Sequence, residues 1–307
     1  MRAVEIEPGE FDLIVSRGIF SWVPDDVKER ILLLCRQGLK PTGLAAIAYL
    51  TYPGWKQREA IRELLMMRVH EKEKPEERIR ESALLLRLLH AGCSAYEHDV
   101  HAQSLKAHVE TMQKSSTNAF LHDELGRVHD PCYFLQFAEW AAECGLQYLA
   151  EADLGTMSAE GLDGSADLLL RELAPDFPET QQLIDFIANR SGRSSLMVRD
   201  DASPLRSFST ESPKPLNFGT SWWHVTPLNA PPDAAARFES NGGRSFHVEN
   251  PCVRWVLSAL SSVPDGVISH ATLEAGAARN GYASTEVGPN LLSLVAKGIV
   301  EPRSIID

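Results

Sequence analysis

Two short apolar runs, separated by a helical pattern, constrain this chain more than any other feature. Residues 11–15 form a short apolar run, and residues 44–50 are apolar throughout without polar alternation. Both patterns are typical of strands buried on both faces. Between them, Pro24 opens a pattern of helical spacing, and Gly38 stands where a left-handed cap would end a helix. This order predicts a crossover that joins two parallel strands through a helix.

The predicted strand pair has to belong to a larger sheet, because two parallel strands cannot bury their own faces and edges. Only ten residues precede the first run, and the pattern turns helical after Trp55. We therefore expect a sheet that is cut off at its N-terminal side, with no convincing further strand downstream. Ligands of open α/β sheets lie at the carboxyl ends of the strands. Those ends, Ser16 to Gly18 and Thr51 with Tyr52, are the candidate site.

Three segments carry a resemblance to a known family. Two of them are FDLIVSRGIFSWVPDDV at residues 11–27 and LKPTGLAAIAYLTYPGW at residues 39–55. They resemble the second half of a class I S-adenosylmethionine-dependent methyltransferase, of the bacterial group that carries a methyltransferase regulatory domain. The third segment, residues 118–154, is similar to the regulatory domain itself. This group includes bacterial protein-lysine methyltransferases.

The resemblance implies a Rossmann-like sheet in which residues 11–15 and 44–50 are the fourth and fifth strands. From their position at the strand ends, we then expect Ser16, Arg17 and Gly18 to contact the family's cofactor S-adenosylmethionine, and Tyr52 to act in catalysis beside the substrate amine. The glycine-rich loop of the family and the acidic residue that holds the ribose would precede residue 1. We therefore expect that this chain alone does not bind the cofactor measurably.

Four parts are expected along the chain. Residues 1–57 form the end of the methyltransferase domain, and residues 58–190 form a helical regulatory domain. Residues 191–249 are rich in Ser, Pro, Gly and Asn, which predicts an irregular linker. Residues 250–307 show three helical patterns and a short strand, typical of a winged-helix-like module. The fold class is therefore α/β followed by a mainly α region.

Proline and glycine residues indicate the helix boundaries inside the predicted regulatory domain. Pro75 separates two helices that are expected to pack together. Asp130 and Pro131 have the residue types of a helix N-cap and first turn, and Gly145 those of its end. Residues 146–151 then predict a short strand.

Charge and composition exclude several classes of function. The net charge of -12 counts against nucleic acid as a partner, because affinity for nucleic acid depends on basic contacts. No run of eighteen apolar residues predicts a membrane-inserted helix. The five cysteines have no CxxC pair, so we expect buried thiols, a cytoplasmic location and no metal site. The histidines between residues 98 and 108 also lack the paired spacing of zinc ligands.

Two hypotheses about function remain open at this stage. In the first, the chain belongs to an enzyme that methylates a protein lysine, and its acidic middle attracts a basic polypeptide. In the second, the chain is a non-catalytic regulatory fragment that binds a protein partner or another subunit. The free edge of the first strand also leaves open a homo-oligomer.

Overall fold

The computed structural model describes residues 7–96, 98–157, 164–174, 176–204, 217–224, 236–240, 245–263 and 267–303. The chain divides into two compact units. Unit 1 comprises residues 1–150 and 163–202, and unit 2 comprises residues 151–162 and 203–307.

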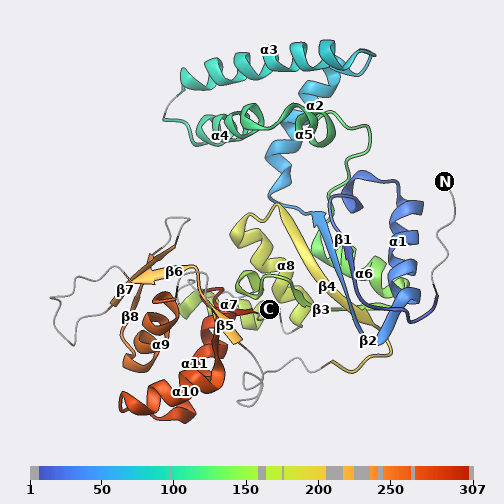
Figure 1. The fold of residues 1–307 in the computed structure, drawn as a ribbon. Helices are drawn as coiled ribbons and strands as arrows, with labels where there is room; N and C mark the ends of the chain where they lie inside the picture. The colour runs from blue at the N-terminus through green and yellow to red at the C-terminus, as the bar shows by residue number, and fades with distance from the viewer. Residues whose placement is uncertain are drawn as a thin grey trace. The chain divides into compact units, whose positions relative to one another are not determined.

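Unit 1 is built on a four-stranded sheet in the order β1-β2-β4-β3 (Figure 1). Strand β1 (Phe11–Ser16) lies parallel to β2 (Leu39–Leu50), and helix α1 (Asp25–Gly38) joins them, so the predicted crossover is confirmed. Strand β4 (Gly192–Arg199) runs antiparallel to β2, and β3 (Leu146–Glu151) lies beyond it. The prediction that no downstream segment extends the sheet was therefore wrong.

The sheet buries its two predicted strands on one face rather than two. Along β2 the buried residues alternate, with Ala45, Ile47 and Tyr49 at most 3% exposed. In β1, Leu13 and Val15 are 57% and 63% exposed. The buried core packs against one face of the described sheet, so the side chains of Leu13 and Val15 on the other face are exposed.

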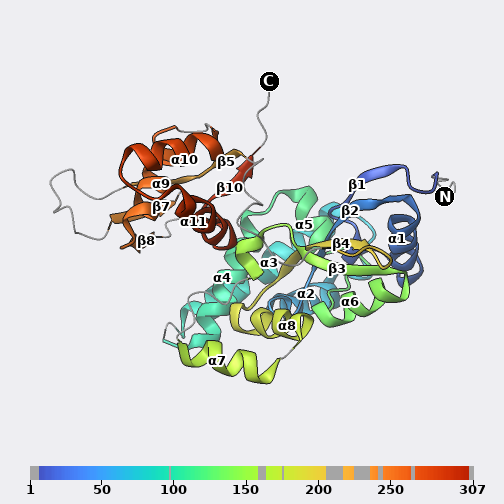
Figure 2. The ribbon, with the colours of Figure 1, turned by 90° about the horizontal axis from the view of Figure 1, so that it is seen from below.

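Helices α1 and α6 (Phe134–Glu143) cover the buried face of the sheet. Their apolar side chains form one core with β2, β3 and β4, centred on Phe20, Leu32, Phe134 and Phe137. Figure 2 shows α6 and α8 (Phe177–Ala188) on one side of the sheet. This core fixes the strand ends that carry the candidate site.

Two predicted helix caps differ from the structure. Gly38 is the last residue of α1 and is buried, and the chain enters β2 directly in extended conformation at Leu39. Helix α6 begins after Pro131, with Tyr133 as its N-cap. The delay arises because Cys132 forms a bridge with Thr51 and is held beside the end of β2. The end of the helix at Gly145, with φ of +78°, and the strand after it agree with the prediction.

Four helices of unit 1 pack around a core of their own (Figure 1). They are α2 (Trp55–Val69), α3 (Pro75–Ser94), α4 (Val100–Lys114) and α5 (Thr117–Asp123). Pro75 is the first residue of α3, which packs on α2 as expected. Helix α2 follows directly from the turn after β2, so this turn joins the sheet to the four helices.

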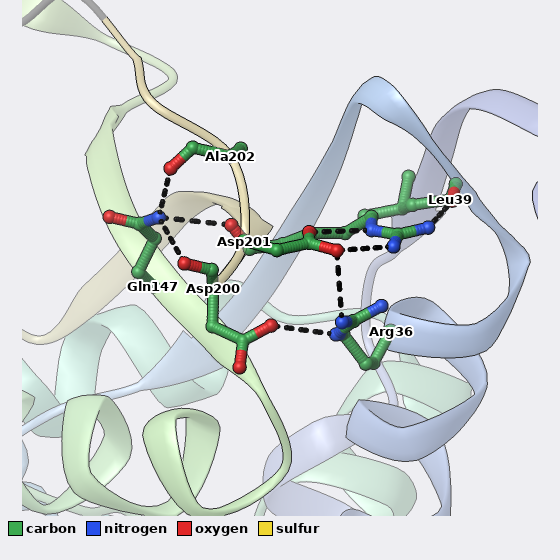
Figure 3. A network of polar contacts seen from close by, with 7 residues as sticks. Arg36, Leu39, Gln147, Asp200, Asp201 and Ala202 are labelled. Carbon is green, nitrogen blue, oxygen red and sulfur yellow. Dashed lines mark hydrogen bonds and ion pairs between the residues drawn. The ribbon is translucent and has the colours of Figure 1, made fainter.

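A network of polar contacts lies at the carboxyl end of β4 (Figure 3). Arg36 of α1 donates to Asp200 at 2.9 Å, and Arg199 donates to Asp201 at 2.9 Å. The amide of Gln147 in β3 donates to the carbonyl oxygens of Arg199 and Ala202, at 2.9 and 2.8 Å. The network thus links α1, β3 and the turn after β4.

The described residues of unit 2 include three α-helices and two small sheets. The helices are α9 (Pro251–Ser261), α10 (His270–Arg279) and α11 (Ser284–Ala296), close to the three predicted patterns. One sheet has the strand order β10 (Glu301–Arg303), β5 (Asn217–Gly219) and β9 (Ile268–Ser269). The other has the order β6 (Trp222–His224), β7 (Ala236–Ser240) and β8 (Ser245–Val248). A short 3-10 helix (Leu154–Met157) also belongs to this unit.

Strands therefore occur where the sequence predicted an irregular linker. Strand β4 completes the sheet of unit 1, and β5 to β8 contribute to the core of unit 2 through Phe218, Trp222 and Phe238. The remaining helix, α7 (Gly164–Leu173), belongs to unit 1. Among the described helices, none combines the length and apolar character needed to cross a membrane.

Candidate functional site at the carboxyl ends of two parallel strands

The predicted cofactor residues follow one another at the carboxyl end of β1. Ser16 lies opposite Ile47 in the strand register and is 8% exposed. Its hydroxyl has no hydrogen-bond partner among the described residues, although it is buried. Arg17 is exposed, and Gly18 has φ of +70° with open space around the position of a Cβ. Because a buried hydroxyl without a partner is unfavourable, Ser16 is suited to contact a ligand at this edge.

Tyr52 lies in a turn that two distant segments anchor. The backbone N–H groups of Thr51 and Gly54 donate to the carbonyl oxygens of Ser191 and Arg190, at 3.1 and 2.9 Å. The hydroxyl of Thr51 donates to the carbonyl oxygen of Cys132 at 2.8 Å. A Cβ at residue 54 would lie 2.5 Å from backbone atoms of residues 189 and 190, so the close approach requires glycine. The sequence thus fixes the position of Tyr52.

The side chain of Tyr52 is engaged on its hydroxyl and on its ring. The hydroxyl donates to Glu59 Oε1 and Oε2, at 2.9 and 3.0 Å. The ring centroid lies 5.2 Å from that of Tyr133, and the ammonium of Lys56 lies 3.7 Å from the Tyr52 centroid. Burial, together with the Glu59 carboxylate, raises the pKa of Tyr52. The group is therefore a neutral phenol at physiological pH, and its ring face is what it offers to a cation.

The structure does not bring the two predicted groups into contact. Ser16 is level with Ile47, and Tyr52 follows Ile47 by five positions, the last two beyond the end of β2. Five steps of about 3.3 Å correspond to roughly 16 Å along the chain. A ligand that touches both groups has to extend along the carboxyl edge of the sheet.

Sequence reasoning missed His129 and Trp22 at the same edge. The ring of His129 contacts that of Trp55 at 4.8 Å, edge to face, and Trp22 contacts His122 at 5.0 Å. Both ring nitrogens of His129 and the indole N–H of Trp22 are buried without a hydrogen-bond partner in the described part of the chain. Burial, and then the charges of Arg62 and Arg58, lower the pKa of His129 to about 4. Its imidazole is therefore neutral at pH 7.

A hydrogen bond joins the segments that carry these residues. The N–H of Asp130 donates to the carbonyl oxygen of Ser21 at 2.9 Å. No signal in the sequence indicates this pairing, because over a hundred residues separate the two segments. Neither His122 nor His129 is among the site residues expected from the sequence.

An arginine–glutamate pair supports the aromatic residues. The guanidinium of Arg58 lies 4.5 Å from the Trp55 ring and donates to Glu124 Oε1 at 2.9 Å. Glu124 is fully buried, and burial raises the pKa of its carboxyl although Arg58 acts in the opposite direction. The pair fixes the ring of Trp55 and hence the position of His129.

Residues at this edge fit only part of a cofactor site. The hydroxyl of Ser16 and the open backbone at Gly18 are suited to polar contacts with S-adenosylmethionine. Neither these two residues nor Arg17 offers a carboxylate for a ribose. Within the described residues, no group of three His, Cys, Asp or Glu side chains is arranged to hold a metal ion.

Comparisons with known proteins identify one domain and the fold. Residues 116–199 match the family described as "Predicted methyltransferase regulatory domain". An uncharacterized Rickettsia prowazekii protein, RP789, is 27% identical over 303 residues, which cover 95% of this chain and 54% of the relative. A second protein of that organism, RP028, is 32% identical over 135 residues, or 43% of this chain and 53% of the relative. The chain thus spans about half the length of these relatives.

Solved structures extend the likeness to nearly the whole chain. PKMT2 from Rickettsia typhi in complex with AdoHcy has a TM-score of 0.79 at 23% identity, over 97% of this chain and 59% of that protein. A second structure of PKMT2 gives a TM-score of 0.78 at 24% identity and the same coverage. The resemblance inferred from the sequence is confirmed to this extent: residues 116–199 match the methyltransferase regulatory domain model, and the chain shares the fold of PKMT2 over nearly its whole length.

Proposed function

We propose that this chain is part of an S-adenosylmethionine-dependent methyltransferase that modifies lysine amines of proteins. The observation that carries the proposal is the fold shared with PKMT2, whose structure contains AdoHcy. AdoHcy is what remains of S-adenosylmethionine after methyl transfer. The regulatory domain match at residues 116–199 supports the same enzyme class.

In this proposal, the residues at the carboxyl edge position two reactants. S-adenosylmethionine, when bound, supplies an electrophilic methyl group. Ser16 and Gly18 contact the donor through a hydroxyl and open backbone. Tyr52 would offer its ring face to the lysine side chain that carries the amine, and would so help to position it. The lysine ammonium has to release its proton to water before its nitrogen attacks the methyl group, because the raised pKa of Tyr52 argues against a phenolate as the base.

We further propose that residues 1–307 alone bind the donor only weakly. Ser16, Arg17 and Gly18 provide few of the contacts that a nucleoside ligand needs. Strand β1 stands at the end of the strand order among the described residues, and the PKMT2 structures contain residues that this chain does not cover. A donor site completed beside β1 accounts for both facts.

The four-part division at residues 57, 190 and 249, and the winged-helix-like character of the last part, stay predictions. So do the protein partner, the absence of a nucleic-acid partner, the homo-oligomer and the cytoplasmic location. The acidic surface is consistent with a basic polypeptide substrate, since net charge steers association. All five cysteines are free and buried, which is consistent with a reducing compartment.

A non-catalytic binding function is the second candidate, and exposed apolar residues favour it. Leu168, Leu169 and Leu173 of α7 are 56% to 70% exposed. An amphipathic helix with an uncovered apolar face is typical of a surface that meets another protein. In this case the chain would bind a partner without turnover.

The test uses the protein purified from its native cells, together with whatever co-purifies. It is incubated with methyl-labelled S-adenosylmethionine and polylysine, and the label is located by mass spectrometry. We expect methyl groups on lysine amines. Donor binding without transfer to any polypeptide amine would contradict the enzyme proposal and favour the binding function.

A calorimetric titration of residues 1–307 with S-adenosylmethionine tests the proposed weak binding separately. We expect no measurable heat of binding. A micromolar dissociation constant would show that the chain contains a complete donor site.

A further inference from the structure

Lys56, in the first turn of α2, holds its ammonium against the ring of Tyr52. Nζ lies 3.7 Å from the ring centroid and 3.7 Å from Glu59 Oε2. Glu59 also accepts the Tyr52 hydroxyl through both carboxylate oxygens. A cation therefore occupies a site made of an aromatic face and a carboxylate, the two groups that proteins use to bind ammonium ions.

We propose that Tyr52 and Glu59 form an ammonium subsite for a lysine side chain of a polypeptide, and that Lys56 is its internal occupant. The identity of that polypeptide as the methylated substrate rests on the proposed function. An incoming lysine displaces Lys56 and takes over the same two contacts. Lys56 thereby competes with the substrate and limits its affinity.

The walls of the subsite are fixed. Thr51 and Gly54 anchor the turn through backbone hydrogen bonds, and the ring of Tyr52 packs on Tyr133. The side chain of Glu59 is 24% exposed and accepts the Tyr52 hydroxyl. A rigid aromatic face beside an oriented carboxylate loses little entropy when it binds a cation, which favours exchange of one ammonium for another.

The occupant, in contrast, is able to move. The side chain of Lys56 is 55% exposed, and at exposed sites a cation–π contact contributes only about 0.5 to 1 kcal/mol. Lys56 also lines a cavity of about 380 Å³ among α2, α3 and α4, whose other walls include Ile61, Leu64 and Leu105. Its aliphatic stem can pack there after the ammonium has left Tyr52.

The subsite has a defined ligand chemistry. The ring face attracts any ammonium, methylated or not, whereas the carboxylate prefers a cation that still carries N–H groups. An uncharged side chain of the same length has neither interaction. Recognition therefore requires the positive charge of lysine rather than its aliphatic stem.

The experiment measures binding, independently of methyl transfer. Residues 1–307, as wild type and as Lys56→Gln, are titrated with Nα-acetyl-lysine methylamide and followed by NMR. We expect Lys56→Gln to bind the probe about two- to fivefold more tightly. This factor corresponds to the free energy of the exposed cation–π contact with which Lys56 competes against the probe. Lys72→Gln is the matched control, because Lys72 is also exposed but lies after the end of α2. It changes the net charge equally and is expected to bind like the wild type.

Two further measurements complete the test. Tyr52→Leu is expected to lose binding while its circular dichroism stays that of the wild type. Nα-acetyl-norleucine methylamide, which lacks the charge, is expected not to bind. Equal affinities of the Lys56 and Lys72 variants, or equal binding of the uncharged probe, would overturn the subsite. A different result would contradict the proposed function alone: the native protein would transfer no methyl group although lysine still binds at Tyr52.

Discussion

Asp185 of α8 and Arg193 of β4 form an ion pair whose side chains are both fully buried. Arg193 Nε donates to Asp185 Oδ2 at 2.8 Å, and Nη2 donates to Oδ1 at 2.9 Å. The guanidinium also lies 4.0 Å from the Phe134 ring, at the start of α6. The pair thereby holds β4 and α8 on the core, next to Arg190 and Ser191, which anchor the Tyr52 turn.

Asp185→Ala is expected to lower the free energy of unfolding of unit 1 by about 3 to 5 kcal/mol. The reason is that the substitution removes the carboxylate that neutralises a buried guanidinium. Urea denaturation followed by circular dichroism measures the change. Asp201→Ala is the control, because Asp201, which pairs with Arg199 (Figure 3), is half-exposed and the pair should matter little. Equal losses in both variants would contradict the argument.

Gly54→Ala is expected to destabilise unit 1 by about 1 to 3 kcal/mol, since the new methyl group would overlap backbone atoms that cannot move aside. Gly92→Ala is the matched control. Gly92 lies exposed in α3 with no atom within 4 Å of the position of a Cβ. There alanine should stabilise the helix by about 0.5 to 1 kcal/mol. Shifts of the thermal unfolding temperature in opposite directions for the two variants would support the close approach at Gly54, and shifts in the same direction would refute it.

The strand ends and the turn at Tyr52 could be predicted because apolar runs locate β1 and β2. Strand β4 could not be predicted in this way, because the residues that face the core include the polar Arg193 and Ser195. The ion pair with Asp185 and the contact of Ser195 Oγ with the Tyr49 hydroxyl, at 3.1 Å, make this polar face stable in the core. Hydrophobic periodicity does not detect such a strand.

The part of the site around His129 was also beyond sequence reasoning. His129 acquires its properties from Trp55, Arg58 and Arg62, which lie on a helix more than sixty residues earlier. Neither periodicity nor spacing encodes that contact. The Gly38 and Asp130 caps failed for a related reason, since tertiary pairing of the adjoining strands determined where each helix begins or ends.

The low pKa of His129 predicts a stability that falls in mild acid. The folded-state pKa of about 4 lies below the ordinary value of 6.5. Between these values the unfolded chain binds a proton that the folded chain does not. Stability should therefore decrease as the pH falls from about 6.5 to 4, with a slope of at most about 1.4 kcal/mol per pH unit from this residue.

His129→Phe keeps a ring against Trp55 and removes the titration. Its unfolding free energy should depend less on pH than that of the wild type over this range. His122→Gln, at a half-exposed position, is the control and should keep the dependence of the wild type. Identical slopes for His129→Phe and the wild type would show that other groups cause the acid sensitivity.

The edge of β1 predicts self-association. Val15 is 63% exposed on a strand with one free edge in the described sheet, and such edges pair with other chains. We expect the molar mass by light scattering to rise with protein concentration, and Val15→Lys to reduce the rise. Leu84→Lys replaces a similarly exposed apolar residue on α3 and should have no effect. A strictly monomeric wild type would contradict the prediction.

Turnover by the native protein distinguishes a catalytic role of Tyr52 from a purely structural role in the turn. The hydroxyl binds Glu59 and the ring binds a cation, so Tyr52→Ala removes both interactions and Tyr52→Phe removes the first. Loss of a positioning group costs on the order of 1 to 3 kcal/mol of transition-state stabilisation, or roughly ten- to a hundredfold in rate. We expect losses in this range for Tyr52→Ala and smaller losses for Tyr52→Phe, at saturating S-adenosylmethionine. Because the turn is anchored through Thr51 and Gly54, neither variant should change the thermal unfolding temperature appreciably. Unchanged turnover in both variants would reduce Tyr52 to a residue that only connects the sheet to the helices.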